Sequence, residues 1–508
     1  MKELIVKINN NEHWWGGCSD DGIVMPFDKN TVFSRIIDPN PTENQAAPLL
    51  LSDQGRYIWS ERGFSFEIRN GEIKLSSTKA DILIFDGYKT LSGAFKAASK
   101  KHFPPSMEHP PLKFFNVPQY NTWIELGYNQ TQDNVINYAN GLIENGYSAG
   151  ILMIDDGWCS YYGKWDFRRE AFSNPKKMID ILHNMGFSVM IWICPFITPD
   201  TVVFRELSEY GFLVKDAKGK IAIREWWSGY SAVLDLSNPN AVKWFKSQLD
   251  FLMTNYGVDG FKFDAGDAKY YFDDDINYGN LDANAMSELW GMLGTEYSFN
   301  EYRACFKCSG QAIVQRLRDK AHSWDENGVA SLIPCALAQS IIGHPYICPD
   351  MIGGGSWQSF WDNADNLDWE LFIRYAQCAT LMPMMQYSAA PWRVLSEEHA
   401  SICLESAKLH IKYADEITNL VKESAISGEP IIRYLEYVFP QQGLHSITDQ
   451  FMLGDKIMVA PVFEKGSTSR MVVFPEGIWK DMKGNIYKQG IAQVEAQLDY
   501  LPIFHLED

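Results

Sequence analysis

The 508-residue sequence lacks several features that define other classes of protein. No stretch approaches the roughly 20 consecutive apolar residues of a membrane-spanning helix, and the opening residues MKELIVKINNNEHWW contain no apolar core of a signal peptide. Basic residues are also scarce, since 45 Lys and Arg stand against 64 Asp and Glu, for a formal net charge of −19. Nucleic acids and anionic membranes are bound mainly through cations. We therefore expect a cytoplasmic protein with neither a nucleic acid nor a membrane as partner.

Signatures of metal and disulfide sites are missing as well. The nine Cys form an odd number without a framework spacing. Cys305 and Cys308 form a C-x-x-C pair with no second pair or nearby His at zinc-ligand spacing, so chance spacing is favoured over a zinc or redox site. None of the ten His forms an H-x-x-x-H motif, and the acidic run 273–275 is interpreted as a solvated loop in preference to a calcium site. The sequence thus predicts no metal and no cofactor.

Apolar and aromatic residues are abundant. Hydrophobic residues make up 46% of the chain and aromatic residues 14%, including 17 Trp and 24 Tyr. This composition supports a large buried core. Aromatic rings also stack on the faces of sugars, although large β-rich proteins use many aromatic residues for packing alone.

Residues 1–110 and 401–508 have the patterns of β-structure. Short apolar runs such as Phe64–Ile68 and Ile82–Phe85 are separated by Asn, Gly, Asp and Pro turns in the first segment, and runs such as Met471–Phe474 recur in the last. Each segment is predicted to form a β-sandwich. The Pro-rich stretch KHFPPSMEHPP at 101–111 reads as a linker after the first of them.

Residues 111–400 alternate short apolar runs with longer helical stretches. Such alternation predicts parallel strands joined by right-handed crossovers, and over this length a (β/α)8 TIM barrel. A doubly wound sheet is the alternative, but no Gly-rich phosphate loop follows the first run. The fold class is therefore α/β, a TIM barrel flanked by two β-sandwich domains. The barrel strands are expected at Trp123–Leu126, Ala149–Ile154, Ser188–Ile193 and Gly260–Phe263.

Polar residues cluster where these apolar runs stop, which is where barrel enzymes carry their active sites. An Asp that follows a strand is often only the N-cap of the next helix, but several at successive strand ends, mixed with Trp and Lys, indicate a site. Carboxylate pairs ringed by aromatic side chains suit the hydrolysis of glycosides. The residues concerned are Asp155 and Asp156 in MIDDGW, Trp192 in VMIWICP, Lys262, Asp264 and Asp267 in DGFKFDAGD, Asp319, Trp324 and Asp325 in QRLRDKAHSWD, and Asp350 in HPYICPDMIGGG.

These motifs resemble glycoside hydrolase family 31, and KFDAGD and RLRDKAHSW are similar to its α-galactosidase-like branch. The resemblance implies that Asp264 is the catalytic nucleophile. It also implies that Asp319 is the acid/base, because Trp324 follows by five residues and Arg303 precedes by sixteen, whereas Asp325 fits neither spacing. The substrate-binding residues implied in the same way are Asp155, Asp156, Trp192, Trp227 (with Trp226 as its rival), Lys262, Arg303, Trp324 and Asp350.

One departure from the family pattern bears on the substrate. Typical α-glucosidases of the family carry an Arg-Asn-His segment where this chain reads MMQYSAAPW, with Ser388 near the His position. The resemblance therefore favours a retaining, exo-acting α-galactosidase, with a small carbohydrate as partner and homo-oligomerisation left open. An α-glucosidase or an α-transglycosylase on the same scaffold is the alternative. A non-catalytic sugar-binding protein is the alternative from another class.

Overall fold

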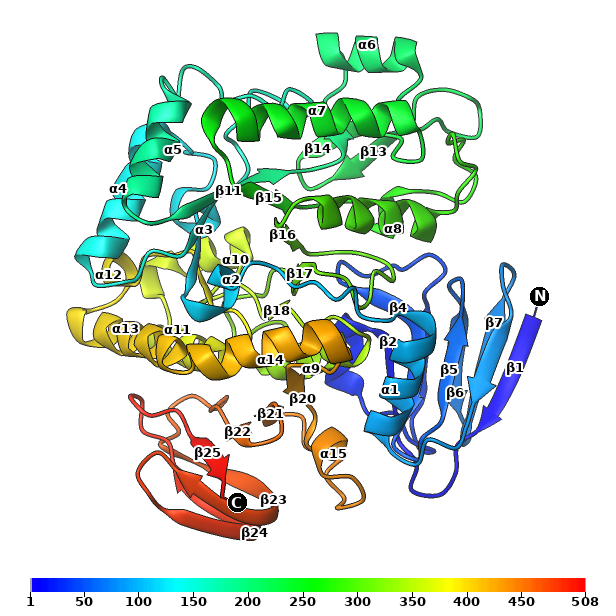
Figure 1. The fold of residues 1–508 in the computed structure, drawn as a ribbon, viewed down its shortest axis with the longest axis vertical. Coiled ribbons are helices and arrows are strands. Elements are labelled where there is room, and N and C mark those ends of the chain that lie inside the picture. The colour runs from blue at the N-terminus through cyan, green and yellow to red at the C-terminus, as the bar shows by residue number, and fades with distance from the viewer. Residues whose placement is uncertain (1, 508) are drawn as a thin grey trace.

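The computed structural model describes residues 2–507. Two antiparallel four-stranded sheets occupy the first segment, shown in blue in Figure 1. In β6 and β7 buried and exposed side chains alternate, so one face of their sheet is covered, and side chains of both sheets join one buried core. The predicted sandwich is confirmed. Its sheets are ordered β1 (Lys2–Lys7), β7 (Glu72–Ser77), β6 (Ser65–Arg69), β3 (Phe33–Ile36), and β2 (Trp14–Cys18), β4 (Ala46–Ser52), β5 (Tyr57–Ser60), β8 (Ile82–Phe85).

The central segment forms an eight-stranded sheet in which neighbouring strands run parallel. Its two outer strands approach each other, because Met351 bridges Gln386 and the amide of Met384 donates to the carbonyl of Ile347 at 3.1 Å. This contact closes the sheet into the predicted TIM barrel and excludes a doubly wound sheet. The strand order is β18 (Ile347–Cys348), β17 (Val314–Arg316), β16 (Phe299–Tyr302), β15 (Gly260–Phe263), β11 (Ser188–Ile193), β10 (Ile151–Ile154), β9 (Gln119–Asn121), β19 (Gln386–Tyr387).

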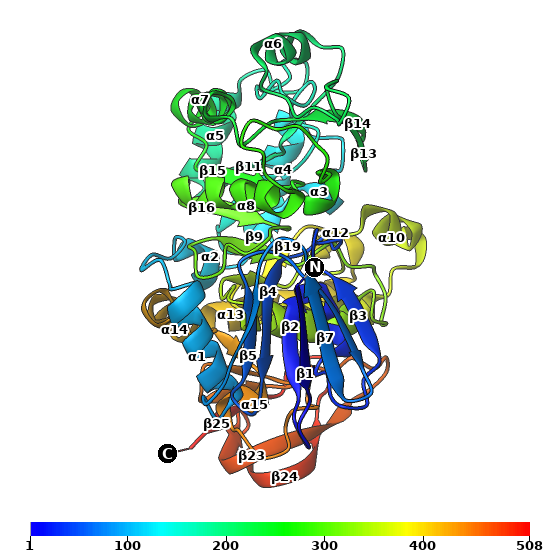
Figure 2. The same ribbon diagram turned by 90° about the vertical axis from the view of Figure 1, so that its right-hand side faces the viewer.

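Helices surround the barrel, and their starts follow the capping residues of the sequence (Figures 1 and 2). The side chains of Thr131, Asn174 and Asp282 each accept a hydrogen bond from a backbone N–H of the first turn, which fixes where α4, α5 and α8 begin. The longer helices are α1 (Leu91–His102), α4 (Gln132–Glu144), α5 (Pro175–Asn184), α6 (Val202–Tyr210), α7 (Pro239–Tyr256), α8 (Ala283–Leu293), α9 (Leu332–Ile341), α11 (Trp369–Ala379), α13 (Glu397–Lys412) and α14 (Ala414–Ser427). The short ones are α2 (Lys113–Asn116), α3 (Trp123–Leu126), α10 (Trp357–Asp362), α12 (Pro391–Val394) and α15 (Leu435–Val438).

A six-stranded sheet with its own apolar core follows α14 (red in Figure 1). Trp479, Phe474 and Phe504 are buried in this core. The domain is thus a single sheet, where the sequence pattern predicted a sandwich. Its strand order is β20 (Ile432–Arg433), β21 (Phe451–Leu453), β22 (Ile457–Val459), β25 (Ile503–Leu506), β23 (Ser469–Asp481), β24 (Ile486–Glu495).

Two apolar runs and one domain boundary differ from the sequence-based prediction. Trp123–Leu126 is the helix α3, and the first barrel strand is the polar Gln119–Asn121. The side chain of Gln119 is fully buried, and its amide donates to the carbonyls of Lys113, Phe114 and Val117. These hydrogen bonds allow a polar strand to lie in the core. A search for hydrophobic runs does not detect such a strand. The predicted domain boundary at residue 400 falls within α13, and the run 431–439 is divided between β20 and α15.

Two further elements prepare the site. A small sheet of β12 (Phe196–Ile197), β14 (Gly229–Val233) and β13 (Ile223–Trp226) follows β11 and carries Trp226 and Trp227 at its hairpin turn. The N-terminal segment 40–45, which precedes β4, contacts the ends of β16 and β17. Within residues 2–507, no helix has both the length and the apolar character needed to cross a membrane.

Candidate active site

A cavity of about 470 Å³ opens at the carboxyl ends of the barrel strands. Eight of the ten predicted site residues line it, and they come from β10, β11, β15, β16, the β13–β14 turn and the loop after β17. These are Asp155, Asp156, Trp192, Trp227, Lys262, Asp264, Arg303 and Asp319. Residues more than 150 positions apart thus meet in one pocket, as expected where the strands of a barrel end together.

Asp264 directly follows β15 and is held by three donors. Trp192 Nε1 donates to its Oδ2 at 2.9 Å, while Arg303 Nε and the amide of Ala265 donate to its Oδ1 at 3.0 and 2.8 Å. Burial opposes ionisation of this carboxyl, but the positive charges of Arg303 and Lys262 outweigh it and hold the pKa of Asp264 well below its ordinary value. The side chain is therefore an ionised carboxylate of fixed orientation.

Arg303 is itself fixed by a second carboxylate. Its Nη2 lies 2.9 Å from Asp267 Oδ2 and its Nη1 3.1 Å from Asp267 Oδ1, a bidentate pair that places the guanidinium beside Asp264. The guanidinium also lies 5.2 Å from the ring centre of Trp227. Asp267 is fully buried and supports the site through Arg303.

Three further charged groups of the cavity lie at the end of β10 and on β15. Lys262 Nζ donates to Asp155 Oδ2 at 2.6 Å, and both side chains are buried. Asp156 accepts a hydrogen bond from the hydroxyl of Tyr162 at 2.8 Å. Burial raises the pKa of Asp156 to about 7, against the lowering effect of that hydrogen bond. The two neighbouring Asp therefore differ, one being neutralised by a cation and the other by its shifted pKa.

Asp319 lies in the loop after β17, and its side chain is more exposed than that of Asp264. Its side chain is 39% exposed, and Arg316 Nη1 lies 2.7 Å from its Oδ1. The same Nη1 contacts Asp350 Oδ1 at 2.8 Å, and Arg316 Nε lies 3.5 Å from Glu301 Oε1. Arg316 therefore links Asp319 to two carboxylates that lie wholly inside the barrel.

Two predicted binding residues are not brought to the cavity. Asp350 is fully buried, where its Oδ2 accepts from the amides of Lys320 and Gly355 at 2.7 and 2.9 Å. It acts on the site through Arg316 and through the backbone beside Asp319, and burial raises its pKa to about 6. Trp324 instead donates from Nε1 to Asp368 at 2.9 Å, outside the lining. Both residues belong to motifs that are close in sequence to residues of the site, but the side chains of Asp350 and Trp324 point away from the cavity.

Asp325, the rival of Asp319, is exposed and accepts from Ser323 and the amide of Asn327 in a local turn. It does not line the cavity. Ser388, near the family's His position, is fully buried, and its hydroxyl accepts from the amide of Ile124 at 2.7 Å. Its place in the fold is beneath α3 and not in the pocket.

Six lining residues were missed from the sequence: Glu43, Trp123, Tyr128, Ser356, Trp357 and Gln358. Trp123 was predicted to begin a barrel strand, and the WQSFW run at 357–361 has the spacing of an ordinary amphipathic helix. Glu43 comes from the N-terminal domain, about 220 positions before Asp264, and no local pattern marks it. Its carbonyl accepts from Arg303 Nη1 at 2.6 Å.

The same N-terminal segment joins two strand ends of the barrel. Gln45 Nε2 donates to the carbonyls of Arg303 and Arg316 at 2.7 and 3.0 Å and to Gln315 Oε1 at 2.9 Å. Asn44 Oδ1 accepts from the amide of Arg318 at 2.6 Å. The N-terminal domain therefore helps to hold in place the ends of β16 and β17, which carry Arg303 and Arg316.

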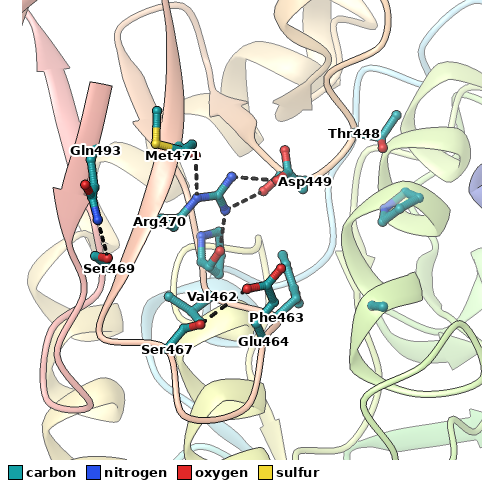
Figure 3. A pocket seen from close by; sticks show the side chains of 13 residues that line it. Thr448, Asp449, Val462, Phe463, Glu464, Ser467, Ser469, Arg470, Met471 and Gln493 are labelled. Atoms are coloured by element: carbon teal, nitrogen blue, oxygen red, sulfur yellow. Dashed lines mark hydrogen bonds and ion pairs between the residues drawn. The ribbon is translucent and has the colours of Figure 1, made fainter. Parts of the chain in front are cut away.

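A second cavity of about 480 Å³ lies between the C-terminal sheet and the segment 330–334 before and within α9 (Figure 3). Its one guanidinium, that of Arg470, donates to Asp449 Oδ2 at 2.6 Å and to the carbonyls of Asp449 and Met471, both at 3.1 Å. Pro461 accepts a further bond. Figure 3 shows the side chain directed at Asp449. The guanidinium of Arg470 is thus fully paired within the C-terminal domain. The groups that line this cavity do not form a set of carboxylates and cations comparable to that at the barrel mouth.

No group of three or more His, Cys, Asp or Glu within the described chain is arranged to hold a metal ion. Cys305 and Cys308 are both buried free thiols. The lining of the barrel mouth combines carboxyl groups held in different environments, two paired cations and aromatic walls. Such a set can attack and protonate a glycosidic bond.

Comparison with known protein families assigns the barrel and the C-terminal sheet to one family. The glycosyl hydrolases family 31 TIM-barrel domain matches residues 110–414, and the glycosyl hydrolase family 31 C-terminal domain matches residues 428–508. The myogenesis-regulating glycosidase of Mus musculus is 32% identical over 406 residues, which are 76% of this chain and 55% of that protein.

More distant proteins are similar as well. Alpha-glucosidase 2 of Bacillus thermoamyloliquefaciens is 23% identical over 419 residues, 75% of this chain and 52% of that protein. The chain thus spans about half the length of these curated relatives. The solved dextranase of Flavobacterium johnsoniae in complex with glucose superposes with a TM-score of 0.84 at 20% identity, over 99% of this chain and 66% of that chain.

Proposed function

Because the chain belongs to glycoside hydrolase family 31, we propose that it is a retaining, exo-acting α-glycoside hydrolase. Asp264 is the nucleophile and Asp319 the acid/base. The observation that carries the proposal is that an ionised, donor-held carboxylate and a half-exposed one line the same cavity of about 470 Å³. That pairing matches the two roles of the retaining mechanism.

In the first step Asp264 attacks the anomeric carbon and forms a glycosyl-enzyme ester. The three donors on its oxygens keep it ionised and aim it, so little reorganisation is needed at the moment of attack. Asp319 gives its proton to the departing oxygen. In the second step it takes a proton from water, which attacks the ester, and the product keeps the α configuration.

The charges of the lining favour a neutral sugar. Both cations of the lining are already paired, Lys262 with Asp155 and Arg303 with Asp264 and Asp267. The lining also carries five carboxyl groups. Glu43, Asp155 and Asp264 supply negative charge, whereas Asp156 has a raised pKa and Asp319 is the proposed proton donor. An anionic sugar would meet net repulsion there, whereas carboxylates accept hydrogen bonds from neutral hydroxyls.

Among neutral sugars we propose an α-galactoside. The support is the departure from the α-glucosidase pattern at Ser388, together with Lys262 at the position two residues before the nucleophile where many α-glucosidases carry Trp. A Lys–Asp pair at that point offers a donor and an acceptor side by side to the ring hydroxyls. An α-glucoside is the alternative substrate on the same machinery.

A panel of p-nitrophenyl α-galactoside, α-glucoside and α-N-acetylgalactosaminide tests the proposal. We expect the galactoside to have the highest kcat/KM, and NMR to detect the α-anomer as the first product. The glucoside as best substrate would overturn the sugar assignment alone. No turnover of any α-glycoside would overturn the enzyme and favour a sugar-binding protein, whereas transfer to added sugar in place of water would make it a transglycosylase.

A further inference from the structure

Cys305 and Cys308 take no part in the proposed mechanism, and the sequence alone favoured chance spacing for this C-x-x-C pair. In the fold, however, the two side chains meet. They share a hydrogen bond, and a Cβ placed on Gly291 of α8 would lie 2.7 Å from Cys308 Sγ and 3.3 Å from Cys305 Cβ. One point on the helix therefore touches both residues, so the thiols are neighbours in space as well as in sequence.

The turn that joins the two cysteines has an unusual backbone. Lys307 and Cys308 have φ of +57° and +56°, in the left-handed region that residues with a side chain rarely adopt. Hydrogen bonds hold this conformation, since the amide of Lys307 donates to the carbonyl of Ala46 at 2.8 Å and the amide of Ala46 donates to the carbonyl of Cys305 at 3.1 Å. The fold thus maintains a costly turn that brings Cys308 back onto Cys305.

The surroundings of Cys305 favour its thiolate. Gln315 Nε2 donates to its sulfur at 3.2 Å, and His344 Nε2 lies 3.9 Å from it. Burial opposes ionisation, but the hydrogen bond with Cys308 and the nearby His344 and Gln315 hold the pKa of Cys305 below its ordinary value. At the other eight cysteines, all buried and all within the described chain, the pKa is raised. Because the thiolate is the reactive form, Cys305 is the nucleophile of the pair.

Cys308 connects the pair to the surface. It is 6% exposed, and its Sγ donates to the carbonyl of Glu288 at 3.5 Å. The carboxylate of Glu288 lies 3.3 Å from Lys307 Nζ, and these two side chains are 32% and 22% exposed. A surface ion pair thus lies beside the thiols, and a molecule as small as hydrogen peroxide can reach them when this pair opens.

Cys305 is also linked to both strands that carry arginines of the active site. It follows Arg303 by two residues at the end of β16, and the side-chain amide of Gln315 on β17 joins its sulfur to Gln45. Gln45 in turn donates to the carbonyls of Arg303 and Arg316. A change at the sulfur of Cys305 therefore reaches the arginines that hold the two proposed catalytic carboxyl groups.

We propose that Cys305 and Cys308 form a reversible redox site that reacts with hydroperoxides and lowers the activity of the enzyme when it is oxidised. With hydrogen peroxide, the Cys305 thiolate attacks one oxygen, the O–O bond breaks, and a sulfenic acid forms as hydroxide leaves. The thiol of Cys308 then attacks this sulfur, the S–O bond breaks, and a disulfide and one water are formed. A thiol reductant reverses the reaction.

Oxidation has a structural consequence. The two sulfurs close from hydrogen-bond contact to about 2.0 Å, so Gln315 loses its thiolate acceptor and the turn bound to Ala46 shifts. The oxidation itself is independent of the proposed hydrolase function, whereas the loss of activity rests on it.

Peptide mapping tests the chemistry without reference to activity. The full chain is treated with hydrogen peroxide, its free thiols are blocked with iodoacetamide, and it is digested with trypsin. Cleavage after Arg303, Lys307 and Arg316 separates ACFK from CSGQAIVQR, so a disulfide would join two peptides that are otherwise apart. We expect the joined pair in the wild type and its loss after dithiothreitol. In Cys308→Ala, dimedone should trap a sulfenic acid on Cys305.

The link to the active site is tested by kinetics and hydrogen exchange. We expect peroxide to lower wild-type kcat on the best p-nitrophenyl substrate about 10-fold or more with little change in KM, since a displacement of about 1 Å can cost about 100-fold. Amide exchange in the segment 44–47 should rise, because the Ala46 amide is bonded to Cys305. Cys305→Ser keeps an acceptor for Gln315 and should resist peroxide in both measurements. Cys378→Ala removes a buried thiol of α11 and should respond like the wild type.

The outcomes separate the two proposals, and the first two need no variant. If peroxide leaves Cys305 and Cys308 free in the folded wild type, the redox site is refuted. If the disulfide forms but neither kcat nor exchange at 44–47 changes, its link to the active site is refuted. An equal fall of kcat in Cys305→Ser would assign the inhibition to other oxidised residues and count against the proposal. A wild type that forms the disulfide and gains exchange at 44–47, but hydrolyses no α-glycoside even when reduced, would refute the hydrolase function and leave the redox site standing.

Discussion

The cavity has two walls that differ: one follows β15 and carries Asp264, and the other follows β17 and carries Asp319. They hold these carboxyl groups in opposite environments. Asp264 follows a barrel strand, has a side chain that is 11% exposed and accepts three hydrogen bonds, whereas the side chain of Asp319 is 39% exposed, lies in a loop and has Arg316 as its charged partner. A nucleophile has to stay ionised and aimed, so burial among donors serves it. An acid/base has to exchange a proton with water in every cycle, so exposure serves it. The difference between the walls therefore corresponds to the division of labour in the proposed mechanism.

The largest expected effect is that of removing the nucleophile. Asp264→Ala should lower kcat by about 10⁴-fold or more on every substrate, because the covalent ester of the proposed mechanism forms on this carboxylate. Steady-state kinetics measures this, and azide should restore turnover in Asp264→Gly with the β-configured product. A variant that keeps near-normal kcat would show that the buried wall does not carry the nucleophile.

The acid/base wall should respond in a way that depends on the substrate. Asp319→Ala should cost about 10²–10⁴-fold in kcat/KM on substrates with poor leaving groups and much less on p-nitrophenyl glycosides, whose departure needs little protonation. The matched control is Asp325→Ala, an exposed Asp six residues later. If Asp325→Ala gives the leaving-group-dependent loss instead, the assignment of this wall is wrong.

Gln45 joins the two walls, so its removal tests whether they are built as one framework. Gln45→Met keeps the length of the side chain but leaves the carbonyls of Arg303 and Arg316 without this donor. We expect a loss of about 1–3 kcal/mol in stability and on the order of a 10-fold fall in kcat with little change in KM, from misplacement of both walls.

Gln54→Met is a suitable control, because Gln54 is bonded to Asn9 and Asn10 on the exposed surface of the same domain. Equal losses in the two variants would argue that Gln45 contributes only to general stability. A fall in kcat for Gln45→Met, with both proteins folded by circular dichroism, would show that the N-terminal domain positions catalytic groups.

The last effect is one of pH on stability and concerns Asp156, which lines the same cavity and has a pKa raised to about 7 by burial. A proton held by the folded state but not by the unfolded chain stabilises the fold below about pH 4, and this contribution is lost as the pH rises through 7. The shift of about three units corresponds to a loss on the order of 4 kcal/mol. Asp156→Asn stays neutral, so its Tm relative to wild type should increase from pH 4 to pH 8. A pH-independent difference in Tm would contradict the raised pKa.

The polar residues at the carboxyl ends of the barrel strands were the part of the site best predicted from sequence. Asp155, Asp156 and Asp264 sit directly after apolar runs and Lys262 lies near the end of one, and a barrel brings such positions to one face whatever the details of packing. Asp350 and Trp324 show the limit of that reasoning. Both lie in motifs near the site, but the direction of a side chain depends on the local loop, and both turn away from the cavity.

By itself the sequence determined the barrel, the two flanking β segments and the strand ends that bear carboxylates, because hydrophobic period and turn residues are properties of short windows of chain. Only the tertiary structure decided the rest. Glu43 and Gln45 reach the site because a separate domain docks on it, and Trp357 because Gly127, 230 positions away, leaves room for its ring. Such contacts join distant parts of the chain, and their energy depends on packing that no local pattern records.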